Sequence, residues 1–90
     1  MSLSGPGRLT VFVSKSEVRT KVLADLTKGP MTPTELASIE GKHVSHVSRA
    51  LAELRAEGLV EPILTSSKTR YYRATDRGIL ITIQFLKRAR

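Results

Sequence analysis

With 90 residues and a mass of 9.9 kDa, the chain is long enough for one small domain, which excludes most two-domain enzyme architectures. It contains no cysteine, no apolar segment near the roughly 20 residues of a membrane span, and no signal-peptide core, so disulfides and cysteine-ligated zinc are excluded and we expect a cytoplasmic protein. Its 15 basic and 8 acidic residues give a net charge of +7, which favours an anionic partner such as nucleic acid or a membrane surface.

The N-terminal part of the chain holds a polar segment followed by an apolar one. Residues 1–8 are rich in Ser, Gly and Pro, so we expect a disordered lead-in, with residues 1–3 a candidate cloning remnant. Residues 9–13 contain four apolar side chains, a stretch too short to distinguish a strand from the start of a helix. We therefore expect the folded domain to span residues 9–90.

A first helix is predicted over residues 15–28. Ser14 and Glu17 have the spacing of a capping box, in which each side chain satisfies a free backbone N–H of the other. Gly29 and Pro30 follow the last apolar position and end the helix.

A second, shorter helix is predicted directly after the first. Thr32 is the expected N-cap, Pro33 the first helical residue, and Glu35 completes a capping box. This helix stops near Glu40, because Gly41 can adopt the left-handed conformation that a tight turn between helices needs.

A third helix is predicted over residues 44–57. Gly58 follows it at the position where a Schellman cap favours glycine. Four apolar residues at helical spacing form its expected buried stripe: Val44, Val47, Leu51 and Leu54.

The apolar period then changes from helical spacing to alternation. Residues 60–65, a polar tip at 66–69 and residues 70–74 predict a β-hairpin. Pro62 cannot donate to a strand ladder, which predicts an edge position, and alternation turns Tyr72 toward the core.

A fourth helix is predicted over residues 77–89. Its positions Ile79, Ile83 and Leu86 are expected to pack on the core. Ile81 and Phe85 would then project away from the core.

This order of elements carries a family resemblance. Residues 34–60, TELASIEGKHVSHVSRALAELRAEGLV, resemble the winged helix-turn-helix of MarR-like and ArsR-like transcription regulators, and residues 45–51 are especially similar to archaeal members. Ala37 and Gly41 match the alanine and turn glycine of that motif. The resemblance covers roughly residues 14–86 and implies an α+β fold with a three-helix core, a two-stranded wing and a C-terminal helix.

The motif has two unusual residues. Glu40 stands where an apolar residue usually precedes the turn glycine, and Lys42 stands where valine or isoleucine usually follows it. His43 is a weaker N-cap than the serine common at that position.

The resemblance implies a regulator that binds double-stranded DNA, with the third helix in the major groove and residues 66–70 as a basic wing on the backbone or minor groove. Residues 66–90 carry seven basic residues and one acidic residue, which fits a basic wing. Arg49 is the expected base reader, because its planar fork matches guanine O6 and N7. The expected DNA-binding residues are Lys42, His43, Ser45, His46, Arg49, Lys68, Thr69 and Arg70.

A homodimer is expected to form from the two ends of the chain, as the resemblance to MarR-like and ArsR-like proteins also implies. The expected dimerisation residues are apolar positions outside the helix-turn-helix pattern: Leu9, Val11, Phe12, Ile81 and Phe85. An alternative is that the N-terminal segment of the same chain covers Ile81 and Phe85, which would give a monomer.

Other functions are weighed against DNA binding. A winged helix can instead serve as a protein-interaction module of a larger transcription or RNA-processing assembly, but such a module would favour apolar residues on the outer face of the third helix. We expect no membrane binding, because the basic C-terminus is short and has no lipidation signal. No nucleophile motif, phosphate loop or metal-ligand set is present, so we expect a non-enzyme without cofactor or metal, and the pattern points to no particular small-molecule effector.

Overall fold

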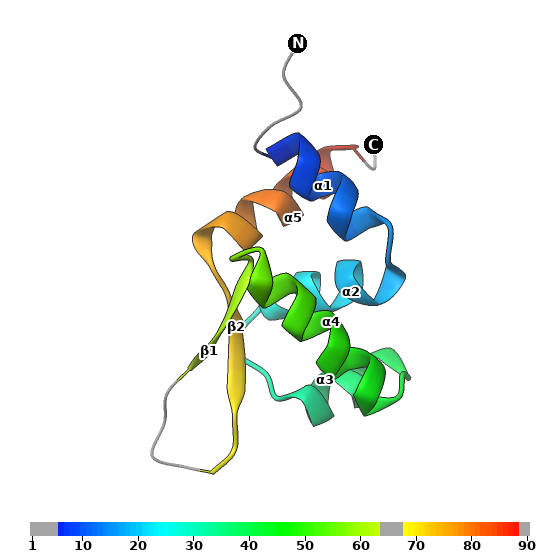
Figure 1. The fold of residues 1–90 in the computed structure, drawn as a ribbon, viewed down its shortest axis with the longest axis vertical. Coiled ribbons are helices and arrows are strands. Elements are labelled where there is room, and N and C mark those ends of the chain that lie inside the picture. Colours follow the sequence, from blue (N-terminus) through cyan, green and yellow to red (C-terminus); the bar gives the residue numbers. More distant parts are fainter. Residues whose placement is uncertain (1–5, 64–67, 89–90) are drawn as a thin grey trace.

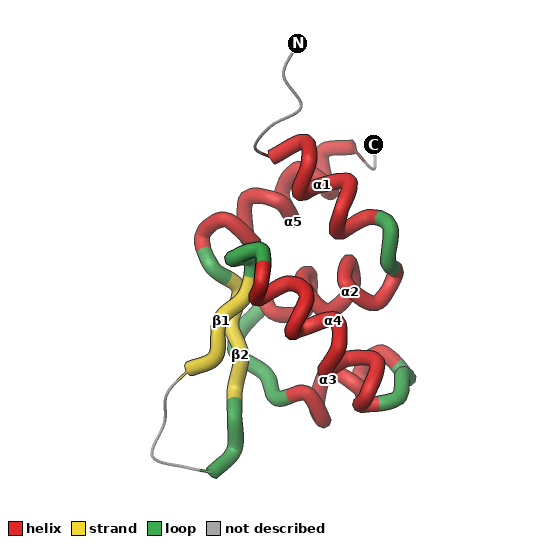
Figure 2. Tube along the Cα trace, viewed as in Figure 1, coloured by secondary structure: helices red, strands yellow, loops and turns green. Residues whose placement is uncertain are grey.

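The computed structural model describes residues 6–63 and 68–88, and these residues form helices around a short antiparallel hairpin (Figures 1 and 2). This is the predicted α+β winged helix-turn-helix architecture. The elements are α1 (Pro6–Ser14), α2 (Glu17–Leu26), α3 (Pro33–Glu40), α4 (Val44–Ala56), β1 (Val60–Ile63), β2 (Tyr71–Ala74) and α5 (Asp76–Arg88). Three parts of the predictions lie outside the described residues, namely residues 1–5 of the expected lead-in with its candidate remnant at 1–3, residues 64–67 of the predicted strand end and tip, and the end of the chain from residue 89.

Helix α1 begins inside the segment that was expected to be a disordered lead-in. Residues 6–8 are helical, so the expected domain start at residue 9 is too late. Leu9 and Val13 are buried in the core, and the Thr10 hydroxyl donates to Gln84 Oε1 at 3.0 Å. The apolar segment is therefore a helix that packs beside α5.

The predicted cap of α2 is displaced by two residues. Ser14 is the last residue of α1, and its hydroxyl donates to the Val11 carbonyl at 3.0 Å. Ser16 has extended backbone angles, and its side chain accepts a hydrogen bond from the Arg19 N–H at 3.1 Å. Because Ser14 lies within α1 and Ser16 has the extended backbone of an N-cap residue, Ser16 rather than Ser14 caps α2.

The helix-turn-helix forms as its local signals predict. Thr32 and Glu35 make both hydrogen bonds of a capping box, at 3.1 and 2.9 Å, and Pro33 opens α3. Gly41 is left-handed with φ 63°, and the following Lys42 N–H bonds the Ala37 carbonyl at 3.0 Å. These contacts fix the turn that sets α4 against α3.

Helix α4 ends in the predicted Schellman cap. Gly58 has φ 76° and its N–H bonds the Arg55 carbonyl at 2.9 Å, while the Leu59 N–H bonds the Leu54 carbonyl at 3.0 Å. One core position was predicted wrongly, because Val44 is 41% exposed. Ala50 occupies the buried stripe instead.

The hairpin packs on the core through β2. β1 and β2 pair antiparallel, with Pro62 opposite Tyr72. On its other side, Tyr72 exchanges two backbone hydrogen bonds with Met31, at 2.9 and 3.1 Å. β2 is therefore flanked on both sides, which leaves β1 at the edge as Pro62 predicted, and Tyr72 packs against the core.

The expected orientation of the last helix is wrong. Ile81 is 1% exposed and Phe85 packs against the core, whereas Ile79, Leu80 and Ile83 are exposed. The third residue of the predicted stripe, Leu86, lies outside the side chains that the structure describes. The physical reason for the observed orientation is Gly78, where an added Cβ would lie 2.2 Å from the Leu59 carbonyl oxygen. Only a glycine allows this approach, and the residues three, four and seven positions after it share its face.

Helix α1 of the same chain covers this face, as the alternative to a dimer supposed. Leu9, Val13 and Ile81 belong to one buried cluster. Leu9 and Ile81 are therefore unavailable to a second chain, and the expected dimerisation surface needs correction. Of its other members, Val11 is 49% exposed, while Phe12 and Phe85 are partly buried against the core.

Candidate nucleic-acid interface

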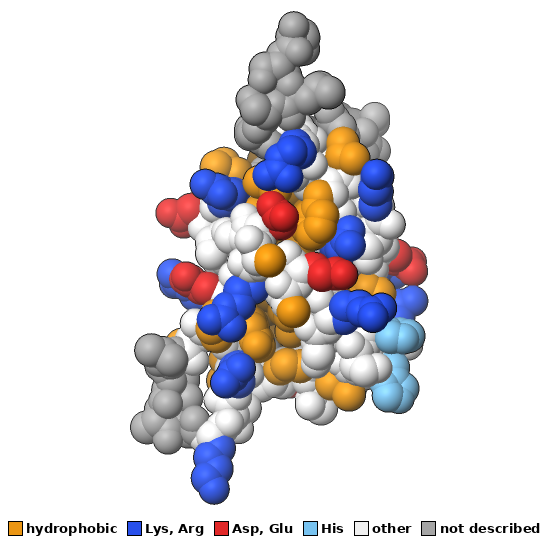
Figure 3. Space-filling view, in the orientation of Figure 1, with side chains coloured by type: hydrophobic (Ala, Val, Ile, Leu, Met, Phe, Trp, Pro, Cys, Tyr) orange, Lys and Arg blue, Asp and Glu red, His pale blue; other side chains and the backbone are white. Residues whose placement is uncertain are grey.

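The outward face of α4 is thin and centred on small side chains. Ser45, Arg49, Ala52 and Ala56 lie opposite the buried stripe, and all four are exposed. Small residues at these positions allow close approach of the helix to another surface. Figure 3 shows this face with basic side chains (blue) spread over it and the two histidines (pale blue) together at one edge.

Arg49 is an exposed cation without an internal partner. Among the described residues it makes no hydrogen bond or ion pair, whereas Arg19, Arg73 and Lys42 each pair with a carboxylate. Its guanidinium is therefore available to an external acceptor.

The N-terminal end of α4 carries two of the predicted residues in internal contacts. His43 is the N-cap residue but makes no side-chain cap bond, and its Nδ1 lies 3.0 Å from Ser45 Oγ. The first backbone N–H groups of α4 are thus left uncapped by a side chain, so this end can meet an anion. The His43 and His46 rings lie 6.1 Å apart between centroids.

Lys42 is paired with an acid rather than free. Its Nζ lies 3.3 Å from Glu17 Oε1, and Lys21 lies 3.3 Å from Glu17 Oε2. Hydrogen bonds from Lys42 and Lys21 lower the pKa of Glu17. One carboxylate against two ammonium groups leaves a net positive site at the helix-turn-helix.

The hairpin carries the second group of predicted residues. Three consecutive residues just before β2 are exposed, namely Lys68, Thr69 and Arg70. Lys68 and Arg70 have no partner among the described residues. Figure 1 places this part of the hairpin and the start of α4 at the same end of the molecule. The structure thus brings the α4 residues and the hairpin residues to one end, while the expected dimerisation residues lie elsewhere.

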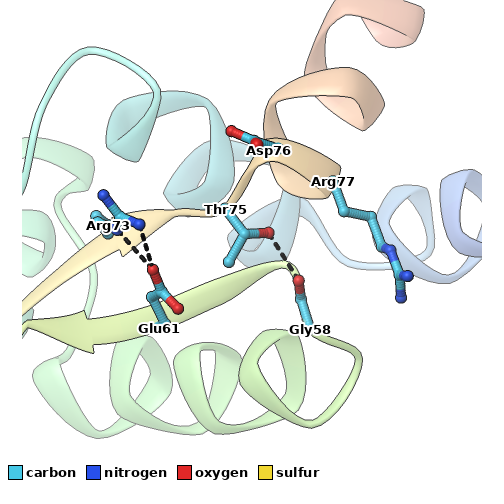
Figure 4. A pocket seen from close by; sticks show the side chains of 6 residues that line it. All are labelled: Gly58, Glu61, Arg73, Thr75, Asp76 and Arg77. Atoms are coloured by element: carbon cyan, nitrogen blue, oxygen red, sulfur yellow. Dashed lines mark hydrogen bonds and ion pairs between the residues drawn. The ribbon is translucent and has the colours of Figure 1, made fainter.

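The base of the hairpin contains an open polar hollow of about 540 Å³, shown in Figure 4. The Arg73 guanidinium pairs with Glu61 at 2.6 Å, and the Thr75 hydroxyl donates to the Gly58 carbonyl at 2.7 Å. These groups satisfy one another and connect β1, β2 and the start of α5. The hollow therefore serves mainly to fix the hairpin on the domain.

Sequence reasoning missed the contacts that hold α4 in place. The Arg19 guanidinium of α2 bonds Glu53 of α4 at 2.9 Å, and Arg8 of α1 lies 3.5 Å from Glu57. No local spacing connects these residues, so the sequence gives no signal for them. Within residues 6–63 and 68–88, no three metal-ligating side chains gather, and no helix is long and apolar enough to cross a membrane.

Comparison with known proteins identifies this arrangement. The model of the arsR family of bacterial regulatory proteins matches residues 16–62, from the cap of α2 through most of β1. The chain belongs to the arsR family. No curated protein sequence matches this arsR-family chain.

Solved structures share the fold at low identity. The transcriptional regulator YodB from B. subtilis has a TM-score of 0.80 at 16% identity, over 92% of this chain and 84% of YodB. The transcriptional regulator BldR from Sulfolobus solfataricus has a TM-score of 0.77 at 22% identity, and the match covers 89% of this chain and 59% of BldR. The zinc-responsive MarR family member ZitR from Lactococcus lactis has a TM-score of 0.73 at 15% identity, and the match covers 80% of this chain and 51% of ZitR. The arsR-family chain therefore spans about half the length of ZitR. The chain carries the winged helix-turn-helix of a transcription regulator.

Proposed function

We propose that this chain is a sequence-specific regulator that binds double-stranded DNA with α4 in the major groove. The observation that carries the proposal is Arg49, an exposed and unpaired guanidinium on a helix face otherwise built from Ser45 and alanines. A thin helix fits the groove, and an arginine fork pairs bidentately with guanine O6 and N7. Arg49 is therefore the proposed base reader.

The N-terminal end of α4 supplies the neighbouring contacts. Ser45 and His46 are exposed within the first turn and are proposed to approach base edges. Lys42 and His43 are proposed to contact phosphate, where the positive end of the helix dipole adds to their charge. Lys42 keeps its attraction for phosphate because Glu17 is shared with Lys21.

The hairpin is the proposed wing. Lys68 and Arg70 are exposed cations at its tip side, and Thr69 lies between them. We assign them to the DNA backbone or the minor groove, where contacts orient the protein without reading sequence directly.

The working species is proposed to be a homodimer, on a surface corrected by the structure. Leu80 is 59% exposed, Val11 49%, Ile83 41% and Ile79 38%. These apolar residues belong to α1 and α5, at the opposite end of the molecule from residues 68–70 of the hairpin (Figure 1). A second copy on this surface would bury them and leave both α4 faces free.

The archaeal character of residues 45–51 and the cytoplasmic location stay predictions from the sequence. The proposed function requires no catalytic step, no cofactor and no membrane.

Binding-site selection from random duplexes tests the proposal. The full chain is incubated with a randomised duplex pool, and bound DNA is enriched, sequenced and footprinted. We expect one enriched motif that contains a guanine in each half-site, with half-site centres about 10 base pairs or a multiple apart. Recovery of duplexes without any enriched motif would contradict specific recognition, and absence of duplex binding would favour the protein-interaction module.

A further inference from the structure

Arg19 lies where three helices meet. From α2, its Nε donates to Glu53 Oε1 of α4 at 2.9 Å, and its Nη1 donates to the Phe12 carbonyl of α1 at 2.6 Å. The guanidinium carbon also lies 4.2 Å from the centroid of the Phe12 ring. The side chain is only 19% exposed, so these contacts hold it in one place.

Glu53 is also a natural partner for Arg49. The two residues are four positions apart on α4, and side chains at this spacing lie on the same helix face within reach of one another. Both line one hollow of about 170 Å³, with Ser16 and Val18 of the α2 end on its other side. No Arg49–Glu53 pair forms among the described contacts, and Glu53 Oε1 is bound to Arg19 instead.

We infer that Arg19 is a positioning residue that occupies Glu53 and so keeps Arg49 free for DNA. The inference rests on the proposed role of Arg49 in base reading. Arg19 holds the carboxylate more firmly than Arg49 can, because it is largely buried and is fixed by a second hydrogen bond and an aromatic ring. An exposed pair within one helix is weaker and is screened by salt.

Replacement of Arg19 is expected to change the pairing of Arg49, although Arg49 itself is not substituted. Glu53 would then be released toward the hollow, which Arg49, a cation without a partner among the described residues, also lines. DNA would have to break the new pair before the guanidinium could reach a base. The result is weaker binding by a protein whose base-reading residue is still present.

The first test replaces Arg19 by methionine and measures affinity for the selected duplex at fixed salt. We expect roughly threefold to tenfold weaker binding for Arg19→Met, in the range set by one internal pair and one uncompensated carboxylate. The matched control is Lys15→Met, which removes one exposed positive charge close by in the chain and is expected to change affinity less than about twofold. Equal losses in the two variants would overturn the inference.

The second test asks whether Glu53 causes the loss. In Arg19→Met with Glu53→Gln, affinity should return to within about twofold of the unmutated chain, although the Arg19 contacts are still missing. A purely structural role of Arg19 predicts no such rescue. Failure of the rescue, with both variants shown to be folded by thermal unfolding, would overturn the inference.

The third test asks whether Arg49 carries the effect. In an Arg49→Ala background, Arg19→Met should cost less than about twofold, because no guanidinium is left for Glu53 to capture. An undiminished cost would mean that Glu53 only repels phosphate. If Arg49→Ala alone leaves DNA binding unchanged, the proposed function of Arg49 fails, which is a separate outcome.

A second variant keeps the test decisive if Arg19→Met does not fold. Arg19→Gln removes the charge but retains a donor for the Phe12 carbonyl. The same rescue by Glu53→Gln and the same comparison in the Arg49→Ala background are expected, and their absence would overturn the inference equally.

Discussion

Gly78 controls how the last helix lies on the domain. Its face of α5 rests directly on the Leu59 carbonyl and the Leu23 side chain. This close approach brings Ile81 into the core and leaves Leu80 outside. A single residue without a side chain thus decides which apolar stripe of α5 is buried.

Replacement of Gly78 by alanine should destabilise the fold. The added Cβ would lie 2.2 Å from the Leu59 carbonyl oxygen and 3.1 Å from a Leu23 methyl group, so the helix must shift. We expect a loss of about 1 to 3 kcal/mol in the free energy of unfolding, measured by denaturant titration. Gly7→Ala is the control, because nothing lies within 4 Å of that Cβ and alanine favours a helix. Equal stability of the two variants would contradict the packing described for α5.

Glu40 and Asp25 bring two carboxyl groups together beside the helix-turn-helix. Asp25 is 8% exposed, and its Oδ2 has no hydrogen-bond partner among the described residues. A hydrogen bond with Asp25, burial and the charge of Asp25 raise the pKa of Glu40, against the opposing effect of Lys21 and Lys28. The acid at position 40, unusual for the motif, therefore carries an energetic cost when it is ionised.

Glu40→Gln should stabilise the protein near neutral pH by about 1 kcal/mol, because a neutral amide can donate to Asp25 without losing a proton. The raised pKa of Glu40 means that the native state holds its proton more firmly than the unfolded state. Stability of the unmutated chain should therefore fall as pH rises from the usual glutamate range through the raised pKa. Glu40→Gln should lack this fall, and the advantage should shrink in acid.

Thermal unfolding across the pH range checks this prediction. Glu57→Gln is the control, because Glu57 makes only a long surface contact of 3.5 Å with Arg8. A Glu40→Gln variant that is no more stable than the unmutated chain at neutral pH would argue against the carboxyl pair.

At the scale of elements, the sequence predicts the end of a helix best where a single residue determines that end. Thr32, Glu35, Gly41 and Gly58 each have a single local role, and the structure confirms all four. The predicted cap of α2 is two residues too early, because Ser14 and Ser16 both suit the position. Only the length of α1 decides between them.

Packing between elements explains the remaining differences. Two apolar stripes of α5 fit a helix equally well, and the choice depends on contact with the backbone of Leu59. The outward face of α4 could be predicted because it lies within one helix. The pairs Lys42–Glu17 and Arg19–Glu53 could not, because they join residues 25 and 34 positions apart.

The hairpin is the element that we expect to act as the wing. Removal of Lys68 and Arg70 together should lower the salt dependence of DNA binding, because each phosphate contact releases condensed counterions. The slope of log K against log salt should decrease by about 2. A Lys15 and Lys28 double alanine variant removes the same charge outside the hairpin and should change the slope less. An unchanged slope in the hairpin variant would exclude it as the wing.

At the scale of the whole molecule, the two ends of the domain have different surfaces. Unpaired basic side chains lie on α4 and the hairpin, and four of the six large apolar side chains that are exposed among the described residues lie on α1 and α5. This division allows one end to bind DNA while the other contacts a second copy.

Leu80→Asp with Ile83→Asp should convert the proposed dimer to a folded monomer. Both residues are exposed in the single chain, so the charges disturb a partner rather than the core. Sedimentation should show half the mass and weaker binding to a two-half-site duplex. Ile39→Asp, at a 58% exposed site on α3, is the control and should leave the mass unchanged. A monomeric unmutated chain at micromolar concentration would contradict the dimer.

The most direct test of the central claim compares Arg49→Ala with the unmutated chain on two duplexes, the selected site and a shuffled sequence of equal length. The account predicts a loss of about 1 to 3 kcal/mol on the selected site, relaxed preference at one base position, and nearly unchanged affinity for the shuffled duplex. Equal losses on both duplexes would contradict base reading by Arg49 and make it a phosphate contact.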